Sequence, residues 1–373
     1  MSSLERLTRH AEARLERLRA AGQHRSLKPT SRGPEARARR GGRGLVSFCD
    51  NDYLSLSCDP RLAAAAGDAA NRYGVGAGAS RLVTGDCPLN GALEKRLADM
   101  KGMEACLVFG SGYLANVGTI PALVGKADTI LMDALSHSCM HAGARLSGAE
   151  IRVFRHNDVA HAGELMREAQ GQVLVLTETV FSMDGDLAPL EELAALCEQH
   201  GAWLMTDDAH GLGVVAQTNP APIQMGTLSK AAGAYGGYVC APAPVIDMLT
   251  SRARSLVYTT GLPPPVLAAA ITALDIMRDE PDRARRAMAN AKLFCELMGL
   301  PAPESVIVPV IIGEESRAMA ISDALEREGY LVTAIRPPTV PEGTSRLRVT
   351  FAAGHTEDDV RGLGEALGRA MAA

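Results

Sequence analysis

Two short apolar stretches, separated by an amphipathic helical pattern, constrain the fold of this chain most strongly. The stretches are VLVLTE (173–178) and WLMTDD (203–208), and PLEELAALCEQHG (189–201) lies between them. The intervening segment has Pro at its start and Gly at its end, as helices often do. Strand, helix and strand at this spacing indicate a βαβ unit, and therefore a parallel sheet.

The pattern changes along the chain in a way that indicates more than one domain. Leu residues at helical spacing near the start indicate an amphipathic helix, and a Gly/Pro/Arg-rich stretch follows it. Alternating strands and helices continue to a Pro-rich hinge. A long helical region follows the hinge, and then strand and helix patterns typical of a smaller α+β domain. We therefore expect an α/β protein with an N-terminal helix and linker (1–44), a large domain with a mainly parallel central sheet (45–262) and a smaller C-terminal α+β domain (263–373).

Composition excludes several classes of function. A net charge of −5 gives no support for a nucleic-acid partner or an anionic membrane partner. No apolar stretch reaches the ~18 residues that a membrane helix needs, and the N-terminus lacks the apolar core of a signal peptide. The eight cysteines are scattered, without metal-ligand spacing. These features favour a cytoplasmic protein with reduced thiols.

Lys230 is the most informative single residue. It lies in QMGTLSKAAGAYGGYV (224–239), among small, apolar and hydroxyl side chains. We expect partial burial, which lowers the pKa of a lysine and favours the neutral amine that Schiff-base chemistry requires. The alternative is a lysine whose ammonium group reaches solvent. The surrounding glycines allow close approach of a ligand, and Thr227 and Ser229 can bond a phosphate.

A second candidate group is WLMTDDAHGLG (203–213). Asp207 directly follows an apolar strand, at the carboxyl end of the expected parallel sheet, where ligands bind in open α/β folds. A buried carboxylate there needs a cationic partner, which a pyridinium ring would supply. The alternative role is helix or turn capping, which we expect of Asp208. His210 could donate to the phenolic oxygen of such a ring, or be structural.

Two further segments are weaker signals. FGSGYLANVG (109–118) is a Gly/Ser turn between a strand and a helix, and amides at a helix N-terminus bind phosphate. In DALSHSCMHAG (133–143), His137 and His141 have a spacing that could bind a metal. No carboxylate lies between them and no third ligand is evident, so we expect no metal site.

Taken together, the chain resembles the α-oxoamine synthase family of fold-type-I pyridoxal-phosphate enzymes from about residue 20 to 370. The matching segments are FCDNDYLSLS, YGVGAGASRLVTG, LVFGSGYLAN, LSHSCMHAG, HND, TETVFSMDGDLAPL, LMTDDAHGLGV and GTLSKAAGAYGGYV. The resemblance implies the aminotransferase-like fold, pyridoxal 5'-phosphate as cofactor, and a homodimer whose active sites are shared across the interface.

The resemblance also implies roles for individual residues. Lys230 would form the Schiff base and move the Cα proton, Asp207 would pair with the pyridine nitrogen, His210 would contact the phenolic oxygen, and His137 would stack on the ring. The other cofactor contacts would be Gly112, Tyr113, Ser182 and Thr227, with Thr259 and Thr260 from the neighbouring subunit. The substrate would be surrounded by Arg25, Asn51, His137, Arg336, Thr339 and Arg348. Arg348 is preferred over Arg336 for the amino-acid carboxylate, because a guanidinium binds it bidentately.

Within the family, residues 333–356 look most like the biotin-pathway branch, which condenses L-alanine with pimeloyl-CoA or a pimeloyl-carrier protein and releases carbon dioxide. The alternatives are branches that make 2-amino-3-oxobutyrate, 5-aminolevulinate or a sphingoid-type ketone, or a non-catalytic cofactor-binding protein. One departure stands out. Between His210 and Lys230 the chain has only GLGVVAQTNPAPIQMGTLS, whereas the family usually has a longer loop with a Gly-Arg-Gly segment. That difference concerns the subunit interface and acyl-donor contacts.

Overall fold

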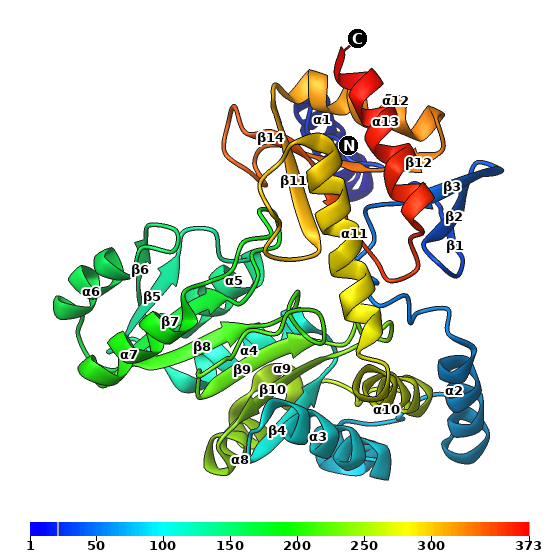
Figure 1. Ribbon diagram of the computed structural model, residues 1–373. Helices are drawn as coiled ribbons and strands as arrows, with labels where there is room; N and C mark the ends of the chain where they lie inside the picture. The colour runs from blue at the N-terminus through cyan, green and yellow to red at the C-terminus, as the bar shows by residue number, and fades with distance from the viewer. Residues whose placement is uncertain (21, 373) are drawn as a thin grey trace.

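A seven-stranded sheet forms the centre of the large domain in the computed structural model, which describes residues 1–20 and 22–372 (Figure 1). All its strands run in parallel except β10, which is antiparallel to both neighbours. This confirms the expected α/β fold with a mainly parallel sheet. In spatial order the strands are β4 (Ala105–Phe109), β10 (Gly237–Ala241), β9 (Ile223–Thr227), β8 (Trp203–Asp207), β7 (Val173–Glu178), β5 (Thr129–Asp133) and β6 (Glu150–Phe154).

Helices cover both faces of this sheet, which explains why β5, β7, β9 and β10 are buried along their whole length. One face packs on α4 (Gly112–Leu123), α5 (Ser138–Ser147), α8 (Ala243–Arg252) and α9 (Arg254–Val257). The other face packs on α2 (Pro60–Tyr73), α3 (Pro88–Lys101), α6 (Val159–Arg167), α7 (Leu190–His200) and α10 (Pro264–Asp279). A short π-helix (Arg81–Gly85) precedes α3.

The C-terminal part contains a three-stranded antiparallel sheet in the order β11 (Ile307–Gly313), β14 (Ser345–Thr350) and β13 (Thr333–Ile335). Its helices are α11 (Asp282–Met298), α12 (Glu315–Arg327) and α13 (Glu357–Ala372). Figure 1 shows α11 leading from the large domain into this smaller one. Because α10 packs against α2 and α3, it lies with the large domain although it follows the Pro-rich hinge. The exact domain boundaries stay a prediction.

The prediction of an irregular linker before residue 44 is wrong. The chain there forms β1 (Ser31–Arg32), β2 (Arg37–Arg40) and β3 (Arg43–Ser47), and β3 pairs in parallel with β12 (Tyr330–Leu331). Gly41 and Gly42 have φ values of 56° and 81°, so they make the two-residue turn that a tight hairpin requires. The two glycines that looked like linker residues are therefore the turn between two strands.

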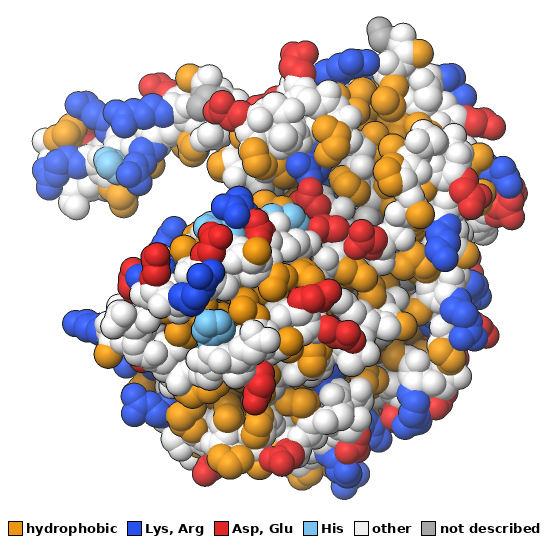
Figure 2. Space-filling view, turned by 60° about the vertical axis from the view of Figure 1, so that its left-hand side comes forward, with side chains coloured by type: hydrophobic (Ala, Val, Ile, Leu, Met, Phe, Trp, Pro, Cys, Tyr) orange, Lys and Arg blue, Asp and Glu red, His pale blue; other side chains and the backbone are white. Residues whose placement is uncertain are grey.

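The N-terminal helix is confirmed as α1 (Ser3–Ala20), but its apolar face is not covered by the rest of this chain. Leu4 and Leu7 are 72% and 66% exposed, and α1 has no buried residue. In the space-filling view α1 projects as an arm, which carries arginines but no lysine (Figure 2). Among the described residues, no helix has the length and apolar character needed to cross a membrane.

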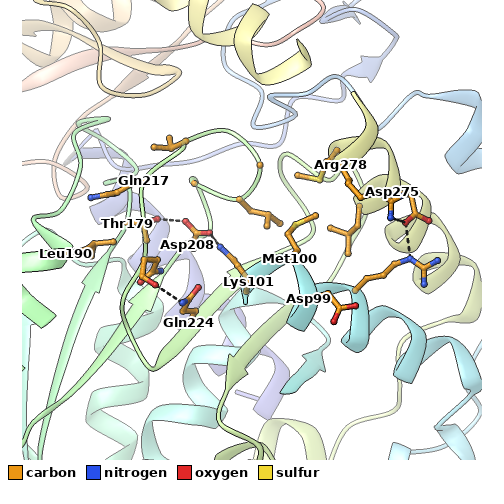
Figure 3. A pocket seen from close by; sticks show the side chains of 18 residues that line it. Asp99, Met100, Lys101, Thr179, Leu190, Asp208, Gln217, Gln224, Asp275 and Arg278 are labelled. Carbon is orange, nitrogen blue, oxygen red and sulfur yellow. Dashed lines mark hydrogen bonds and ion pairs between the residues drawn. The ribbon is translucent and has the colours of Figure 1, made fainter. Parts of the chain in front are cut away.

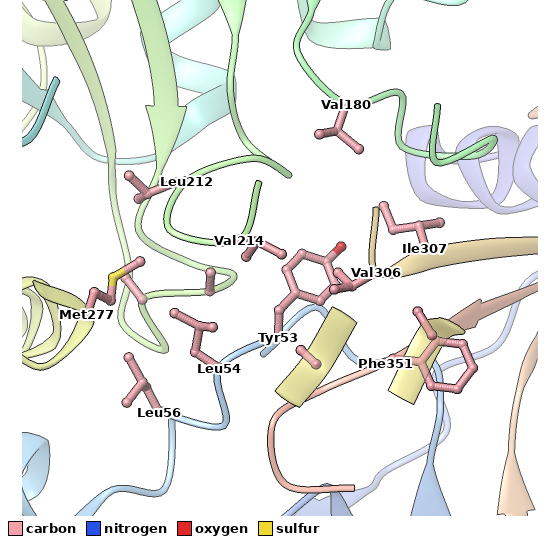
Figure 4. Packing of buried hydrophobic residues seen from close by; sticks show 14 of the residues in the cluster. Tyr53, Leu54, Leu56, Val180, Leu212, Val214, Met277, Val306, Ile307 and Phe351 are labelled. Atoms are coloured by element: carbon pink, nitrogen blue, oxygen red, sulfur yellow. The ribbon is translucent and has the colours of Figure 1, made fainter. Parts of the chain in front are cut away.

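The two domains share one apolar cluster that surrounds Tyr53. Leu212, Val214 and Met277 from the large domain belong to the same buried cluster as Val306 and Phe351 from the small domain (Figure 4). Tyr53 itself has no exposed surface. The cluster fixes the position of the small domain over the carboxyl ends of the central strands, where the candidate site lies.

Candidate active site

A cavity of about 210 Å³ contains Lys230. It lies where β7, β8 and β9 end, at the carboxyl edge of the parallel strands, as expected for a ligand site in this fold. Its walls also include the start of α4 and the turn before α5. The lining residues are Ser111, Gly112, Tyr113, His137, Cys139, Glu178, Asp207, Ala209, His210, Met225, Thr227, Ser229 and Lys230.

Lys230 extends from the loop after β9 into this cavity. Its Nζ lies 2.7 Å from Nε2 of His210. Burial lowers the pKa of Lys230, and the nearby Asp207 and Glu178 carboxyls only partly oppose that shift. The sequence-based prediction of a partly buried lysine with a lowered pKa is confirmed. Such an amine loses its proton more readily than a lysine in solvent.

Asp207 is the last residue of β8 and is 5% exposed. Its Oδ2 accepts a hydrogen bond from Nδ2 of Asn116 at 2.9 Å, and its Oδ1 accepts one from the amide of Ala209 at 3.0 Å. Burial raises the pKa of Asp207, while Lys230 and the Asn116 hydrogen bond act in the other direction. Both donors are neutral, so the charge of this carboxylate has no cationic hydrogen-bond partner here.

The capping role expected of Asp208 is wrong. The adjacent Asp207 accepts the capping hydrogen bond from the amide two residues ahead. Asp208 instead accepts a hydrogen bond from the Thr179 hydroxyl at 2.5 Å and forms an ion pair with Lys101. The reason is strand geometry, because successive residues at the end of a strand point in different directions.

Asp208 faces a separate and larger cavity of about 640 Å³ (Figure 3). That cavity shares no lining residue with the cavity of Lys230. Its wall includes the short loop between His210 and Lys230, and its charges are paired with one another, as Lys101 is with Asp208 and Arg96 with Asp275. Cavity size alone therefore does not select the candidate site, since Lys230, the residue expected to form the Schiff base, lies in the smaller cavity.

His137 is the N-cap residue of α5, and its ring is one wall of the Lys230 cavity. Its Nδ1 accepts a hydrogen bond from the Cys139 amide at 3.2 Å and lies 2.8 Å from the Cys139 Sγ. Burial lowers the pKa of His137, so the neutral ring is favoured. Because Nδ1 is an acceptor, the geometry assigns the ring proton to Nε2.

His210 connects Lys230 to the small domain through a chain of hydrogen bonds. Nδ1 of His210 lies 2.6 Å from the Tyr53 hydroxyl, which donates to Oδ1 of Asn51 at 3.1 Å. Arg348 donates to the same two groups at 3.3 Å and 3.2 Å. Burial lowers the pKa of His210 well below its usual value and raises that of Tyr53. The chain is therefore built from groups that are neutral near pH 7, apart from Arg348 and Lys230.

The turn at the start of α4 approaches β9 closely. A Cβ on Gly112 would lie 3.4 Å from Cβ of Thr227, and the Ser111 hydroxyl caps the helix by accepting from the Leu114 amide at 3.1 Å. Thr227 donates to the carbonyl of Gly236 at 2.8 Å. The first-turn amides of a helix have no intrahelical partner, so those of α4 at the cavity wall suit an anion.

The remaining predicted residues are not brought into this cavity. Arg25, Arg336 and Thr339 line a cavity of about 630 Å³ between the N-terminal segment and β13, and Arg336 is paired there with Glu315. Thr259 and Thr260 line a small cavity elsewhere, and their expected role toward a neighbouring subunit stays a prediction. Ser182 lies behind the wall, where its amide donates to Glu178.

Sequence reasoning missed four residues that complete the site, namely Tyr53, Asn116, Cys139 and Glu178. A signal existed for Glu178, because it ends an apolar strand in the same way as Asp207 does. Within the described residues, no three His, Cys, Asp or Glu side chains gather as they would around a metal ion, His137 and His141 included.

Comparison with known proteins gives consistent relatives. The family described as "Aminotransferase class I and II" matches residues 43–367. A Methylorubrum extorquens (strain PA1) protein named 8-amino-7-oxononanoate synthase is 60% identical over 360 residues, covering 96% of this chain and 94% of the relative. A Methylobacterium radiotolerans protein of the same name is 56% identical, covering 98% of each chain.

Solved structures agree with the sequence relatives. Serine palmitoyltransferase from Sphingomonas wittichii is 30% identical with a TM-score of 0.91, covering 100% of this chain and 99% of its own. 8-Amino-7-oxononanoate synthase from Francisella tularensis is 26% identical with a TM-score of 0.75, covering 87% and 97%. From the matched family, these relatives and the geometry around Lys230, the chain belongs to the class I and II aminotransferase family and, within it, to the α-oxoamine synthases, which are pyridoxal-phosphate-dependent enzymes.

Proposed function

We propose that this chain is an 8-amino-7-oxononanoate synthase of biotin biosynthesis. It condenses L-alanine with a pimeloyl thioester and releases carbon dioxide and the free thiol. The observation that carries the proposal is the position of Lys230, whose amine shares a buried cavity with Asp207, His137 and His210. The names of relatives that are 53–60% identical over nearly the whole chain support the substrates.

The cavity fits pyridoxal 5'-phosphate. Asp207 has neutral donors only, so a protonated pyridine nitrogen would supply the missing cation. The amides of Gly112 and Tyr113 at the start of α4 suit the phosphate, and the Thr227 hydroxyl beside them would have to turn away from the Gly236 carbonyl to donate to it. When bound, the cofactor supplies an aldehyde and an electron-poor ring that stabilises negative charge at the substrate Cα. Ser182 does not line the cavity, so it would act on the cofactor only through its hydrogen bond to Glu178.

Lys230 performs the proton transfers in this proposal. Its lowered pKa makes the neutral amine accessible, so it can accept the Cα proton of the amino acid and return it later. His210 lies within hydrogen-bond distance of Nζ and keeps the amine oriented toward the cavity. His137 presents a neutral Nε2–H group at the opposite wall, where it can bond the substrate.

Arg348 is the group proposed to bind the amino-acid carboxylate. It is 6% exposed, and its hydrogen-bond partners among the described residues are neutral: Asn51, Tyr53 and the carbonyl of Ser182. A buried guanidinium without a carboxylate partner is stabilised by an anion. Arg336 has Glu315 as its partner, so the structure favours Arg348 for this role.

The acyl donor is proposed to approach along the cavity between the N-terminal segment and β13. Arg25 and Thr339 line that cavity, and an open arginine there could bind the distal carboxylate of a pimeloyl chain. A homodimer would bring Thr259 and Thr260 to the phosphate of the neighbouring site. The choice between coenzyme A and a carrier protein, and a cytoplasmic location, belong to the proposal.

The test is thiol release from pimeloyl-CoA by the cofactor-loaded protein, with L-alanine, glycine or L-serine as co-substrate. We expect release that depends on L-alanine. Release with glycine or serine and a different acyl-CoA would instead assign the chain to another branch of the family. Cofactor absorbance without thiol release from pimeloyl-CoA, other acyl-CoA or carrier-protein thioesters would identify a non-catalytic cofactor-binding protein.

A further inference from the structure

A second carboxyl group, Glu178, lies beside Asp207 in the Lys230 cavity. Glu178 ends β7 and Asp207 ends β8, and the two residues are direct neighbours in the parallel register. Side chains of neighbouring residues in register point to the same face of a sheet. Both are buried, with 2% and 5% of their surface exposed, and both line the cavity. The site therefore contains two adjacent acids where only one is needed for a pyridinium ion.

The two carboxyl groups differ in their hydrogen bonds. Both oxygens of Asp207 accept from N–H donors, which stabilises a carboxylate. In Glu178, Oε2 accepts from the amide of Ser182 at 3.3 Å, whereas Oε1 is buried and has no partner among the described residues. An ionised oxygen without a donor is costly in this position. A protonated oxygen there carries no charge that needs a donor, so the neutral carboxyl group is favoured.

The charges around Glu178 and Asp207 also favour ionisation of only one of these two carboxyl groups. The other titratable groups that line the cavity are Asp207, Lys230, His137, His210, Cys139 and Tyr113. Burial lowers the pKa of both histidines and raises that of Cys139 to about 12, so Lys230 is the group of this set that can supply a positive charge to the carboxyl pair, and burial lowers its pKa too. Burial, and next the charge of Asp207, raise the pKa of Glu178 well above its usual value.

We propose that Glu178 is a positioning residue of the cofactor site: it holds the proton of a carboxyl pair, and Asp207 holds the single negative charge. The neutral Glu178 leaves Asp207 as the one carboxylate for the pyridine nitrogen. Through Oε2 it also accepts the hydrogen bond of the Ser182 amide, which holds the turn that begins there. The inference rests on the proposed function only for the identity of that ring.

The first test uses the protein without cofactor, so it does not depend on the proposed function. Glu178→Gln keeps the size and the Ser182 contact but cannot ionise. A carboxyl with a raised folded-state pKa costs stability as the pH rises from about 4.3 toward that pKa, because only the unfolded chain releases its proton. We expect the Tm of Glu178→Gln to exceed that of the wild type by an amount that grows from pH 5 to pH 9.

Glu192→Gln on α7, an exposed acid, is the control, and its Tm difference from the wild type should stay constant with pH. Parallel Tm curves for Glu178→Gln and the wild type would overturn the proposal. Should the variant fail to fold, infrared spectra of the wild type provide the readout. They should show the carbonyl stretch of a protonated carboxyl group at pH 7, and its absence would equally overturn the proposal.

The second test asks which acid carries the charge that the cofactor needs. Binding of pyridoxal phosphate is followed by its absorbance in Glu178→Gln and Asp207→Asn. We expect Glu178→Gln to keep the wild-type Kd within about threefold, because the variant preserves the charge of the site, while Asp207→Asn binds more than about tenfold more weakly. The reverse order would show that Glu178 is the ionised member. A wild type that does not bind the cofactor would refute the proposed function while leaving the first test valid.

Discussion

Asp207 and Asp208 are adjacent in sequence, equally buried and of equal charge, yet they belong to different parts of the molecule. Asp208 faces the larger cavity, where Lys101 neutralises its charge (Figure 3). Asp207 faces the smaller cavity, where its hydrogen-bond donors are neutral and its pKa is raised by burial. The comparison shows that charge left without a partner, rather than cavity size, marks the chemical site.

The same distinction separates two arginines on β14. Arg346 forms an ion pair with Asp184, while Arg348, two residues later on the same face of the strand, has only neutral partners. Both side chains are buried. The paired arginine holds two segments together, and the unpaired one is available for a substrate carboxylate.

The largest effect should come from replacing Lys230, with Lys101 as the comparison. Lys230→Ala should lower the rate of thiol release by roughly 10³-fold or more, because no other amine lines its cavity, and the bound cofactor should lose its Schiff-base absorbance. The folded fraction of Lys101→Met should release thiol at the wild-type rate, because Lys101 does not line the Lys230 cavity. A Lys230→Ala variant with normal turnover would remove this lysine from the mechanism.

Replacing the two aspartates should separate chemistry from stability. Asp207→Asn should reduce turnover by roughly 10²-fold with little loss of stability, since an amide can still make neutral hydrogen bonds. Asp208→Asn should instead cost about 3 kcal/mol of stability, because it leaves Lys101 buried without its partner. Urea unfolding and thiol release measured on both variants check this. Equal effects of the two changes on turnover would contradict the comparison.

The cluster of His156, Asp133 and Asp186 should affect how the stability of the protein depends on pH. His156 bonds to Asp133 at 2.9 Å and to Asp186 at 2.7 Å. Burial opposes protonation, but the two carboxylates outweigh it and raise the pKa of His156 to about 10. A raised pKa gives stability that is complete below the unfolded-state value of about 6.5 and is lost as the pH rises through the folded-state value.

The wild-type Tm should therefore fall between pH 7 and pH 10 more steeply than the Tm of His156→Gln. The exposed His10→Gln serves as the matched control, and its curve should follow the wild type. Parallel curves for His156→Gln and the wild type would show that this histidine is not protonated in the folded protein.

The smallest effect should come from an exposed ion pair. Lys95 and Asp99 are one helical turn apart on α3, with side chains that are 76% and 64% exposed. Lys95→Ala should change the free energy of unfolding by less than about 0.5 kcal/mol, and less at high salt. Urea unfolding at low and high salt measures it. A loss as large as that of Asp208→Asn would show that burial does not decide the value of an ion pair in this protein.

Much of this protein could be predicted from the order of its residues. Local periodicity predicts the βαβ unit, the N-terminal helix and the parallel sheet, because the period of apolar residues is set by backbone geometry. Lys230, alone among small and apolar residues, and Asp207, at the end of an apolar strand, predict the candidate site. The Gly41–Gly42 turn was missed because a pair of glycines is typical of both a linker and a hairpin.

Only the tertiary structure determined which partners those charges have. Tyr53 meets His210 across 157 residues and Arg348 across 295, so no local pattern indicates the chain of hydrogen bonds that joins the two domains. The register of β7 and β8 places Glu178 beside Asp207, and the packing of α3 gives Asp208 its lysine. The reason is physical: sequence sets which groups can ionise, but burial and pairing, which set their pKa values, arise only when distant segments pack together.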